Sequence, residues 1–230
     1  MRLLVQLVLS ILLASPACAT IARVQKADAY PGNSVTLNGT TAGNFLVVSA
    51  SWADTTSDLA VSDTASNTWN ALPVLRGPTG QGPVSIELFY ATNISGGNTT
   101  VMLNSSPADV GIHAVEYSGV GSGASLDVTS SAVAAGASST PTSGSFTPAA
   151  GDLIYVYFAD EGAAQSAITA GTGYTIITMT GDHADASEDN LSATAERRRR
   201  ALRSVQLVAA GLCTWRLSRL QTVLLPIVER

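Results

Sequence analysis

The chain has 230 residues, enough for one domain of ordinary size with a single hydrophobic core. Hydrophobic residues make up 46% and charged residues only 13%, which excludes a disordered chain and is untypical of a cytosolic helical protein. Residues 21–195 carry three basic and fifteen acidic residues, whereas residues 196–230 carry eight Arg and two Glu. The acidity of the larger part argues against nucleic acid as a partner.

The first nineteen residues have the pattern of a secretory signal peptide. A positive charge precedes an apolar stretch over residues 3–13, and the small-x-small sequence "ACA" follows at residues 17–19. The apolar stretch is too short for a lasting transmembrane span. We therefore expect cleavage after Ala19 and export to the periplasm or the extracellular space. Lipidation of Cys18 is the alternative, although Ser15 stands where a lipoprotein signal usually carries Leu.

From Ile21 to about Leu191 the chain reads as strands separated by turns of Gly, Asn and Pro. Alternation over residues 84–90 predicts a strand with one buried and one wet face. Residues 45–48 and 153–158 are apolar on both faces, which is typical of a central strand between two layers. We predict an all-β fold, an antiparallel β-sandwich of the jelly-roll or Ig-like type. The expected strands are 34–37, 44–53, 60–62, 68–72, 84–92, 99–104, 111–117, 143–146, 152–159 and 174–180.

Two of these segments resemble each other. "TTAGNFLVVSASWAD" begins at residue 40 and "PAAGDLIYVYFADE" begins at residue 148, and in each a Gly followed by Asn or Asp introduces the strand. The similarity indicates a faint internal repeat, with two similar halves that face each other.

The basic tail over residues 196–230 differs abruptly from the sandwich predicted for residues 20–195. Arg216 and Arg219 interrupt its apolar stretch and argue against a transmembrane span. An amphipathic helix that attaches to a membrane surface is one interpretation. The other is a shifted reading frame, which the break in composition favours. In that case the sandwich is incomplete at its C-terminal strand.

Catalytic motifs are lacking in the sequence, which contains two histidines, His113 and His183, and no G-x-S-x-G, H-E-x-x-H or C-x-x-C. His113 and Glu116 are three residues apart on an expected strand and so point to opposite faces. Glu87 and Glu116 could line one face of a sheet, which leaves a glycan-active hydrolase as the alternative function. We expect a non-catalytic protein.

Two kinds of binding site remain. Acidic residues before the tail provide the oxygen ligands that calcium prefers, and the candidate ligands are Asp182, Asp185, Glu188 and Asp189. Aromatic rings could stack against a sugar, and the candidates are Trp69, Tyr174 and Tyr117. Trp52 shares a strand face with apolar residues, so we expect it in the core.

"VSDTASNTW" reads as a hairpin in which Asp63 and Asn67 bond the turn backbone. With "IELFYATNISGGNTTVML", "HAVEYSGV" and "SLDV", it resembles bacterial secreted β-sandwich domains of uncharacterised function. The resemblance covers about residues 24–195 and implies a structural or adhesive module, or one that binds polysaccharide or a cell-surface glycan. It implies no catalytic residues and leaves the oligomeric state open. Ser66 stands where the turn usually has Gly, and the expected closing strand is missing from residues 196–230.

Overall fold

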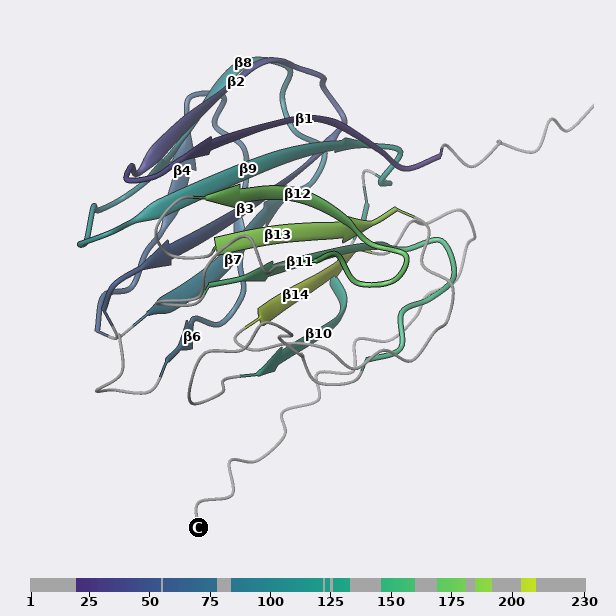
Figure 1. Ribbon diagram of the computed structural model, residues 1–230. Coiled ribbons are helices and arrows are strands. Elements are labelled where there is room, and N and C mark those ends of the chain that lie inside the picture. The colour runs from purple at the N-terminus through teal and green to yellow at the C-terminus, as the bar shows by residue number, and fades with distance from the viewer. Residues whose placement is uncertain are drawn as a thin grey trace, which may run out of the picture.

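In the part of the chain that the computed structural model describes, all regular elements are β-strands, joined into three antiparallel sheets, so the predicted all-β fold is confirmed (Figure 1). No helix in the described part of the chain is long and apolar enough to cross a membrane. The structure describes residues 20–54, 56–77, 84–121, 123–124, 126–132, 146–159, 169–180, 185–191 and 204–209.

A large central sheet and a smaller cover sheet form a sandwich, and both are built from the N-terminal part of the chain. The central sheet has the order β1-β9-β3-β7-β5, and β6 also pairs with β7. The cover sheet has the order β2-β8-β4. The central strands are β1 (Ala22–Ala29), β3 (Phe45–Trp52), β5 (Asn70–Ala71), β6 (Leu75–Arg76), β7 (Ser85–Ala91) and β9 (Gly111–Ser118). The cover strands are β2 (Ser34–Thr40), β4 (Val61–Asp63) and β8 (Gly97–Leu103).

The C-terminal sheet packs on the other face of the central sheet and has the order β10-β14-β11-β13-β12. Figure 1 shows its strands crossing in front of the central sheet, while β2 and β8 lie at the top. Its strands are β10 (Leu126–Ala132), β11 (Leu153–Phe158), β12 (Thr175–Thr180), β13 (Asp185–Asn190) and β14 (Ser204–Ala209).

Alternation along β3 explains why the central sheet is buried on both sides. Leu46, Val48 and Trp52 belong to the core shared with the cover sheet, whereas Phe45 and Val47 belong to the core shared with the C-terminal sheet. Every residue of β3 is buried. The predictions of a central strand here and of a core position for Trp52 are thus confirmed.

With the two-residue strand β6 left out, the central and C-terminal sheets have the same strand order. In each, the first strand in the chain lies at one edge beside the last, the second lies in the middle, and the third lies at the opposite edge beside the fourth. The register agrees as well, because Phe45, the first residue of β3, pairs with Tyr117, and Leu153, the first residue of β11, pairs with Ala209.

Irregular positions are repeated too. The pairing of the first with the last strand shifts between Arg23 and Gln25 in the central sheet and between Leu126 and Thr129 in the C-terminal sheet. Three residues of β1 lie opposite two of β9, and four residues of β10 lie opposite three of β14, so each first strand contains one extra residue, which is a β-bulge.

The turns that lead into β3 and β11 are also alike. Gly43 and Gly151 have φ angles of 89° and 88°, which favour glycine. The next residues, Asn44 and Asp152, each donate a backbone N–H to the carbonyl three residues earlier. Strand order, register, bulge and turn together confirm the predicted repeat of two halves that face each other.

Several expectations about elements need correction. β1, β6, β10 and β13 were not expected as strands, and Phe146, at the end of the strand expected over 143–146, lies outside any strand. Residues 143–145 lie outside the described residues. β14 lies within the tail and pairs with β10 and β11, so the C-terminal sheet has a last strand in the sequence as printed. The shifted reading frame itself stays a prediction.

Candidate functional site

The hairpin that leads into β5 holds Trp69 at one edge of the sandwich. Asp63 Oδ1 accepts the backbone N–H groups of Ala65 and Asn67 at 2.7 and 3.2 Å, and Asp63 Oδ2 accepts the indole Nε1–H of Trp69 at 2.6 Å. One carboxylate therefore shapes the turn and fixes the ring. This confirms the turn role predicted for Asp63.

A neighbouring loop anchors the same hairpin. Asn67 Oδ1 accepts the backbone N–H of Ser95 at 2.7 Å, and Ser66 adopts a φ of 57° in the left-handed region. The Trp69 ring is half-buried and packs on the core between the central and cover sheets. We call Asp63, Ser66, Asn67 and Trp69 the Trp69 corner.

Tyr174 lies in a comparable turn before β12. Its backbone N–H donates to the carbonyl of Gly171 at 2.9 Å, and the N–H of Gly171 donates to Glu188 Oε2 at 2.8 Å. The Tyr174 ring is half-buried and packs against the small cluster formed by Phe146 and Ile154. We call Gly171, Tyr174 and Glu188 the Tyr174 corner.

Tyr117, the third aromatic candidate, is fully buried between the central and C-terminal sheets. Its hydroxyl donates to Asp189 Oδ2 at 2.8 Å. A ring enclosed in this way offers no face to a sugar, so its assignment as a ligand-binding residue is corrected. The sequence signal failed here because burial depends on a strand about seventy residues further along the chain.

The calcium candidates do not converge. Asp185 and Asp189 point from β13 toward the central sheet, where Ser51 and Tyr117 contact them, whereas Glu188 lies on the other face of the strand. Asp182 lies outside the described residues. No group of three or more metal-ligating side chains occurs in the part of the chain that the structure describes.

Glu87 and Glu116 share one face of the central sheet, as expected. Glu87 pairs with Ala50 and Glu116 pairs with Leu46, four residues away on β3, which lies between β7 and β9. At about 3.3 Å per residue and 4.8 Å per strand, the two Cα atoms are about 16 Å apart. Hydrolytic carboxylate pairs are typically about 5–9.5 Å apart, so these two do not form one.

Glu116 is engaged by structural hydrogen bonds. Its Oε1 accepts the Thr41 backbone N–H at 2.8 Å and Asn44 Nδ2 at 2.6 Å, and its Oε2 accepts Gln25 Nε2 at 2.6 Å. The carboxylate thus ties β1 and the turn before β3 to β9. A buried acid satisfied in this way has a structural role.

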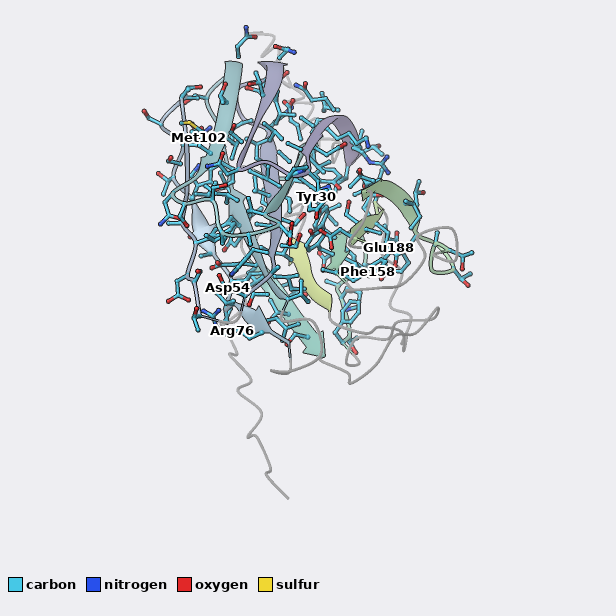
Figure 2. The ribbon with its side chains drawn as sticks, turned by 60° about the vertical axis from the view of Figure 1, so that its left-hand side comes forward. Tyr30, Asp54, Arg76, Met102, Phe158 and Glu188 are labelled. Atoms are coloured by element: carbon cyan, nitrogen blue, oxygen red, sulfur yellow. The ribbon has the colours of Figure 1, made fainter. Side chains whose placement is uncertain are left out.

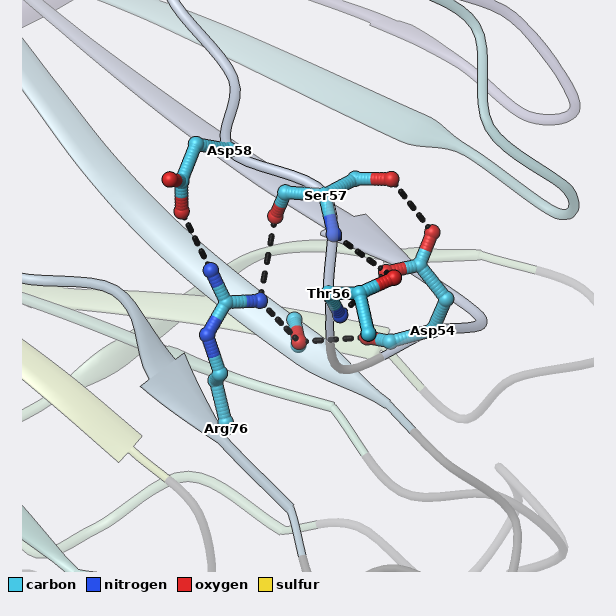
Figure 3. A network of polar contacts seen from close by, with 6 residues as sticks. Asp54, Thr56, Ser57, Asp58 and Arg76 are labelled. Atoms are coloured by element: carbon cyan, nitrogen blue, oxygen red, sulfur yellow. Dashed lines mark hydrogen bonds and ion pairs between the residues drawn. The ribbon is translucent and has the colours of Figure 1, made fainter.

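A second polar network closes the end of the sandwich near β6 (Figure 3). Asp54 accepts the backbone N–H groups of Thr56 and Ser57, each at 2.7 Å, and these bonds outweigh burial and lower its pKa to about 2. Arg76 donates to the Ser57 carbonyl at 3.0 Å and forms an ion pair with Asp58. In Figure 2, Asp54 and Arg76 lie near each other and away from Glu188.

Glu87 is buried close enough to this network for the charges of Asp58 and Arg76 to act on it. Its Oε2 is buried and has no hydrogen-bond partner among the described residues. Burial, helped by the charge of Asp58 and opposed by Arg76, raises the pKa of Glu87 to about 7. A carboxyl that titrates near neutrality is a feature of some acid catalysts. Here it faces the core beneath the cover sheet, because its cross-strand partner Ala50 belongs to that core.

Polar contacts between the central and C-terminal sheets were not foreseen from the sequence. Ser49 Oγ and Tyr155 OH are 2.8 Å apart, Tyr157 OH donates to Asp185 Oδ2 at 2.9 Å, and Ser51 Oγ donates to the same oxygen. We call this set, with the Asp189 contacts, the polar seam. The alternation of Asp185, Ser187 and Asp189 along one strand is the one sequence pattern that could have predicted the polar seam.

His113 lies in the polar seam, with its ring centroid 5.3 Å from that of Tyr157. Burial lowers the pKa of His113 to about 4, so the ring is neutral at pH 7. Both ring nitrogens are buried without a hydrogen-bond partner in the described part of the chain. His183, the other histidine, lies outside the described residues.

Comparison with protein-family models, with curated proteins and with solved structures finds no match to this chain.

Proposed function

We propose that this chain is an exported, non-catalytic β-sandwich module that binds a neutral polysaccharide through the Trp69 corner. Export follows from the signal-peptide pattern of residues 1–19. The resemblance to bacterial secreted β-sandwich domains supports a role on the cell surface or in the extracellular matrix. The observation that carries the proposal is the half-buried Trp69 ring, whose orientation Asp63 fixes.

A fixed aromatic ring at a sheet edge suits a sugar ligand. Trp combines a large apolar face with a polar edge, and here the edge is already bonded to Asp63 at 2.6 Å. Little side-chain freedom remains to be lost when a sugar ring stacks on the exposed face, which favours binding.

The charges support a neutral ligand. Each Lys or Arg side chain among the described residues already lies in an ion pair with an acid, so none is left to hold an anionic sugar. The pairs are Arg23–Asp189, Lys26–Asp28 and Arg76–Asp58. The separation of Glu87 from Glu116 favours binding over glycan hydrolysis.

Affinity electrophoresis tests the proposal. The wild type, Trp69→Ala and Met102→Ala are run through native gels that contain cellulose derivatives, β-1,3-glucan, mannan or xylan. Met102 is the control, because its side chain is apolar and the residue is 37% exposed on the outer face of the cover sheet, whereas Trp69 packs on the core beneath that sheet. We expect at least one polysaccharide to retard the wild type and Met102→Ala, but not Trp69→Ala.

Two results would overturn the proposal. If no polysaccharide retards the wild type, a purely structural or adhesive module is the better reading. If Trp69→Ala is retarded as strongly as the wild type, the ligand does not bind at this corner. Retention by anionic vesicles instead of polysaccharide would favour attachment to a membrane surface through residues 196–230.

A further inference from the structure

The Trp69 and Tyr174 corners occupy equivalent positions in the two repeated sheets. Trp69 directly precedes β5 and Tyr174 directly precedes β12, and each of these strands lies at the sheet edge beside the fourth strand. The first residue of β5 pairs with Tyr90, and the first residue of β12 pairs with Asp189. Tyr90 and Asp189 are equivalent in turn, since each pairs with the third residue of the middle strand.

The two rings also pack in the same way. Trp69 packs on a cluster that includes the second and fourth residues of β3. Tyr174 packs on a cluster that includes the second residue of β11, and the fourth residue of β11 packs on the same cluster. Both rings thus lie on the face of their sheet that points away from the other repeated sheet. In each corner a carboxylate bonds the turn that carries the ring, Asp63 in one and Glu188 in the other.

The repeated sheets face each other across a pseudo-twofold axis. Arg23 of β1 bonds Asp189 of β13, and at the equivalent positions Leu126 of β10 and Tyr90 of β7 pack against the same core cluster. The first strand of each sheet therefore lies against the fourth strand of the other. Such mutual contacts are the signature of an isologous interface, here formed within one chain.

This symmetry places the two corners at opposite edges of the protein. Figure 1 shows β12 at the upper side of the C-terminal sheet and β6, which shares its edge with β5, at the lower side of the central sheet. Because β12 lies one strand beyond β1 and β5 lies four strands from β1, five strand spacings of about 4.8 Å and a sheet separation of about 10 Å put the edges about 26 Å apart. Each corner can therefore bind a separate short sugar ligand.

We infer that Tyr174 forms a second binding site of the same kind as Trp69, and that the protein is bivalent and cross-links neutral polysaccharide chains. The inference rests on the proposed function, because it extends the ligand class of the Trp69 corner to its equivalent. Two sites on opposite edges hold separate chains, and together they give avidity toward a polymer that neither site has alone.

Stoichiometry and cross-linking test the inference separately from the proposed function. Isothermal titration with neutral hexasaccharides of glucose, mannose, xylose or N-acetylglucosamine counts the sites on the wild type, Trp69→Ala, Tyr174→Ala and Met102→Ala. Light scattering then follows the size of the matching soluble polysaccharide as protein is added. Far-ultraviolet circular dichroism checks that each variant is folded, and Trp69→Tyr covers the case in which Trp69→Ala does not fold.

We expect two sites on the wild type, on Met102→Ala and on Trp69→Tyr, and one site on each alanine variant at residues 69 and 174. The wild type should enlarge the polysaccharide, and single-site variants should bind it without enlarging it. One site on the wild type, unaffected by Tyr174→Ala, would overturn the inference and leave the proposed function standing. A wild type that binds none of the sugars would overturn the proposed function itself.

Discussion

Replacing Arg23 by Met tests how the C-terminal sheet is held on the central sheet. Arg23 Nε donates to Asp189 Oδ2 at 2.9 Å and its Nη2 donates to Oδ1 at 2.8 Å, while Tyr117 OH donates to Oδ2 at 2.8 Å. Asp189 is 1% exposed, so its carboxylate has lost nearly all contact with water. In Arg23→Met it keeps one of these three hydrogen bonds and loses its countercharge.

The expected cost follows from this burial. Removing one partner of a buried ion pair costs about 3–5 kcal/mol, because the other charge is left without compensation. The Arg23 side chain is 26% exposed, so water screens part of the interaction and favours the lower end of the range. We expect Arg23→Met to lose about 3 kcal/mol of unfolding free energy, or about 6–12 °C in Tm.

Two further variants separate the ion pair from general packing. In Arg23→Met/Asp189→Asn no buried charge remains and Tyr117 can still donate to the amide oxygen, so we expect most of the stability to return. Lys26→Met is the matched control on the same strand. Its ion pair with Asp28 is 3.2 Å long between side chains that are 42% and 34% exposed, so its loss should cost at most about 0.5 kcal/mol.

Urea unfolding at pH 7, followed by circular dichroism and Trp fluorescence, measures all four variants, Asp189→Asn included. The account predicts a coupling free energy of at least about 1.5 kcal/mol between Arg23 and Asp189 in this double-mutant cycle. It would be refuted if the effects of the two single changes simply added, or if Arg23→Met were as stable as Lys26→Met.

Three other positions give changes that stability measurements can check. The pKa of Glu87 is raised from 4.5 to about 7, so the wild type loses stability as the pH rises between these values. Relative to wild type, Glu87→Gln should gain about 1–2 kcal/mol of unfolding free energy at pH 8 and almost nothing at pH 4. Equal gains at both pH values would contradict this. The pKa of His113 is lowered from 6.5 to about 4, so the wild type loses stability as the pH falls through this range. The unfolding free energy of His113→Leu relative to wild type should therefore be about 2 kcal/mol higher at pH 5 than at pH 7.5. A difference that does not depend on pH would refute the neutral ring. Ser66 has a φ of 57°, so Ser66→Gly should raise the unfolding free energy by about 1 kcal/mol in urea titrations, and a loss of stability would show that the turn does not need that angle.

The strands that the sequence predicted well are those whose pattern is set by burial alone. Residues 45–48 and 153–158 are apolar on both faces, and they lie in β3 and β11, the strands in the middle of their sheets' strand orders. The turn signals were equally informative, since Asp63 bonds the hairpin backbone as expected. In these segments local chemistry and tertiary packing favour the same conformation.

β13 shows where local reasoning fails. Its acidic sequence was interpreted as a calcium-binding loop, but Asp185 and Asp189 are buried strand residues that face hydroxyl groups and a guanidinium. The partner Arg23 lies 166 residues earlier in the chain, so no local pattern reveals the pair. Tyr117 also bonds Asp189, 72 residues further along the chain, and its burial there removes it from the binding candidates.

Register was the other quantity that the sequence did not contain. Glu87 and Glu116 were expected on one face and do share it, yet their offset of four residues along β3 is known only from the strand pairing. Trp69 and Tyr174 were selected because each lies beside a turn. Their equivalence became visible only when the two sheets were compared strand by strand.

The most direct test of polysaccharide binding at the Trp69 corner is a proton–nitrogen NMR titration that observes the indole Nε1–H groups, with a hexasaccharide of whichever polysaccharide retards the protein. The Trp69 signal is assigned from its loss in Trp69→Phe, and the signal of Trp52, which is buried in the core, serves as the internal control. The account predicts that the Trp69 signal shifts in a saturable way while the Trp52 signal stays in place. A Trp69 signal that does not move at saturating ligand would contradict it.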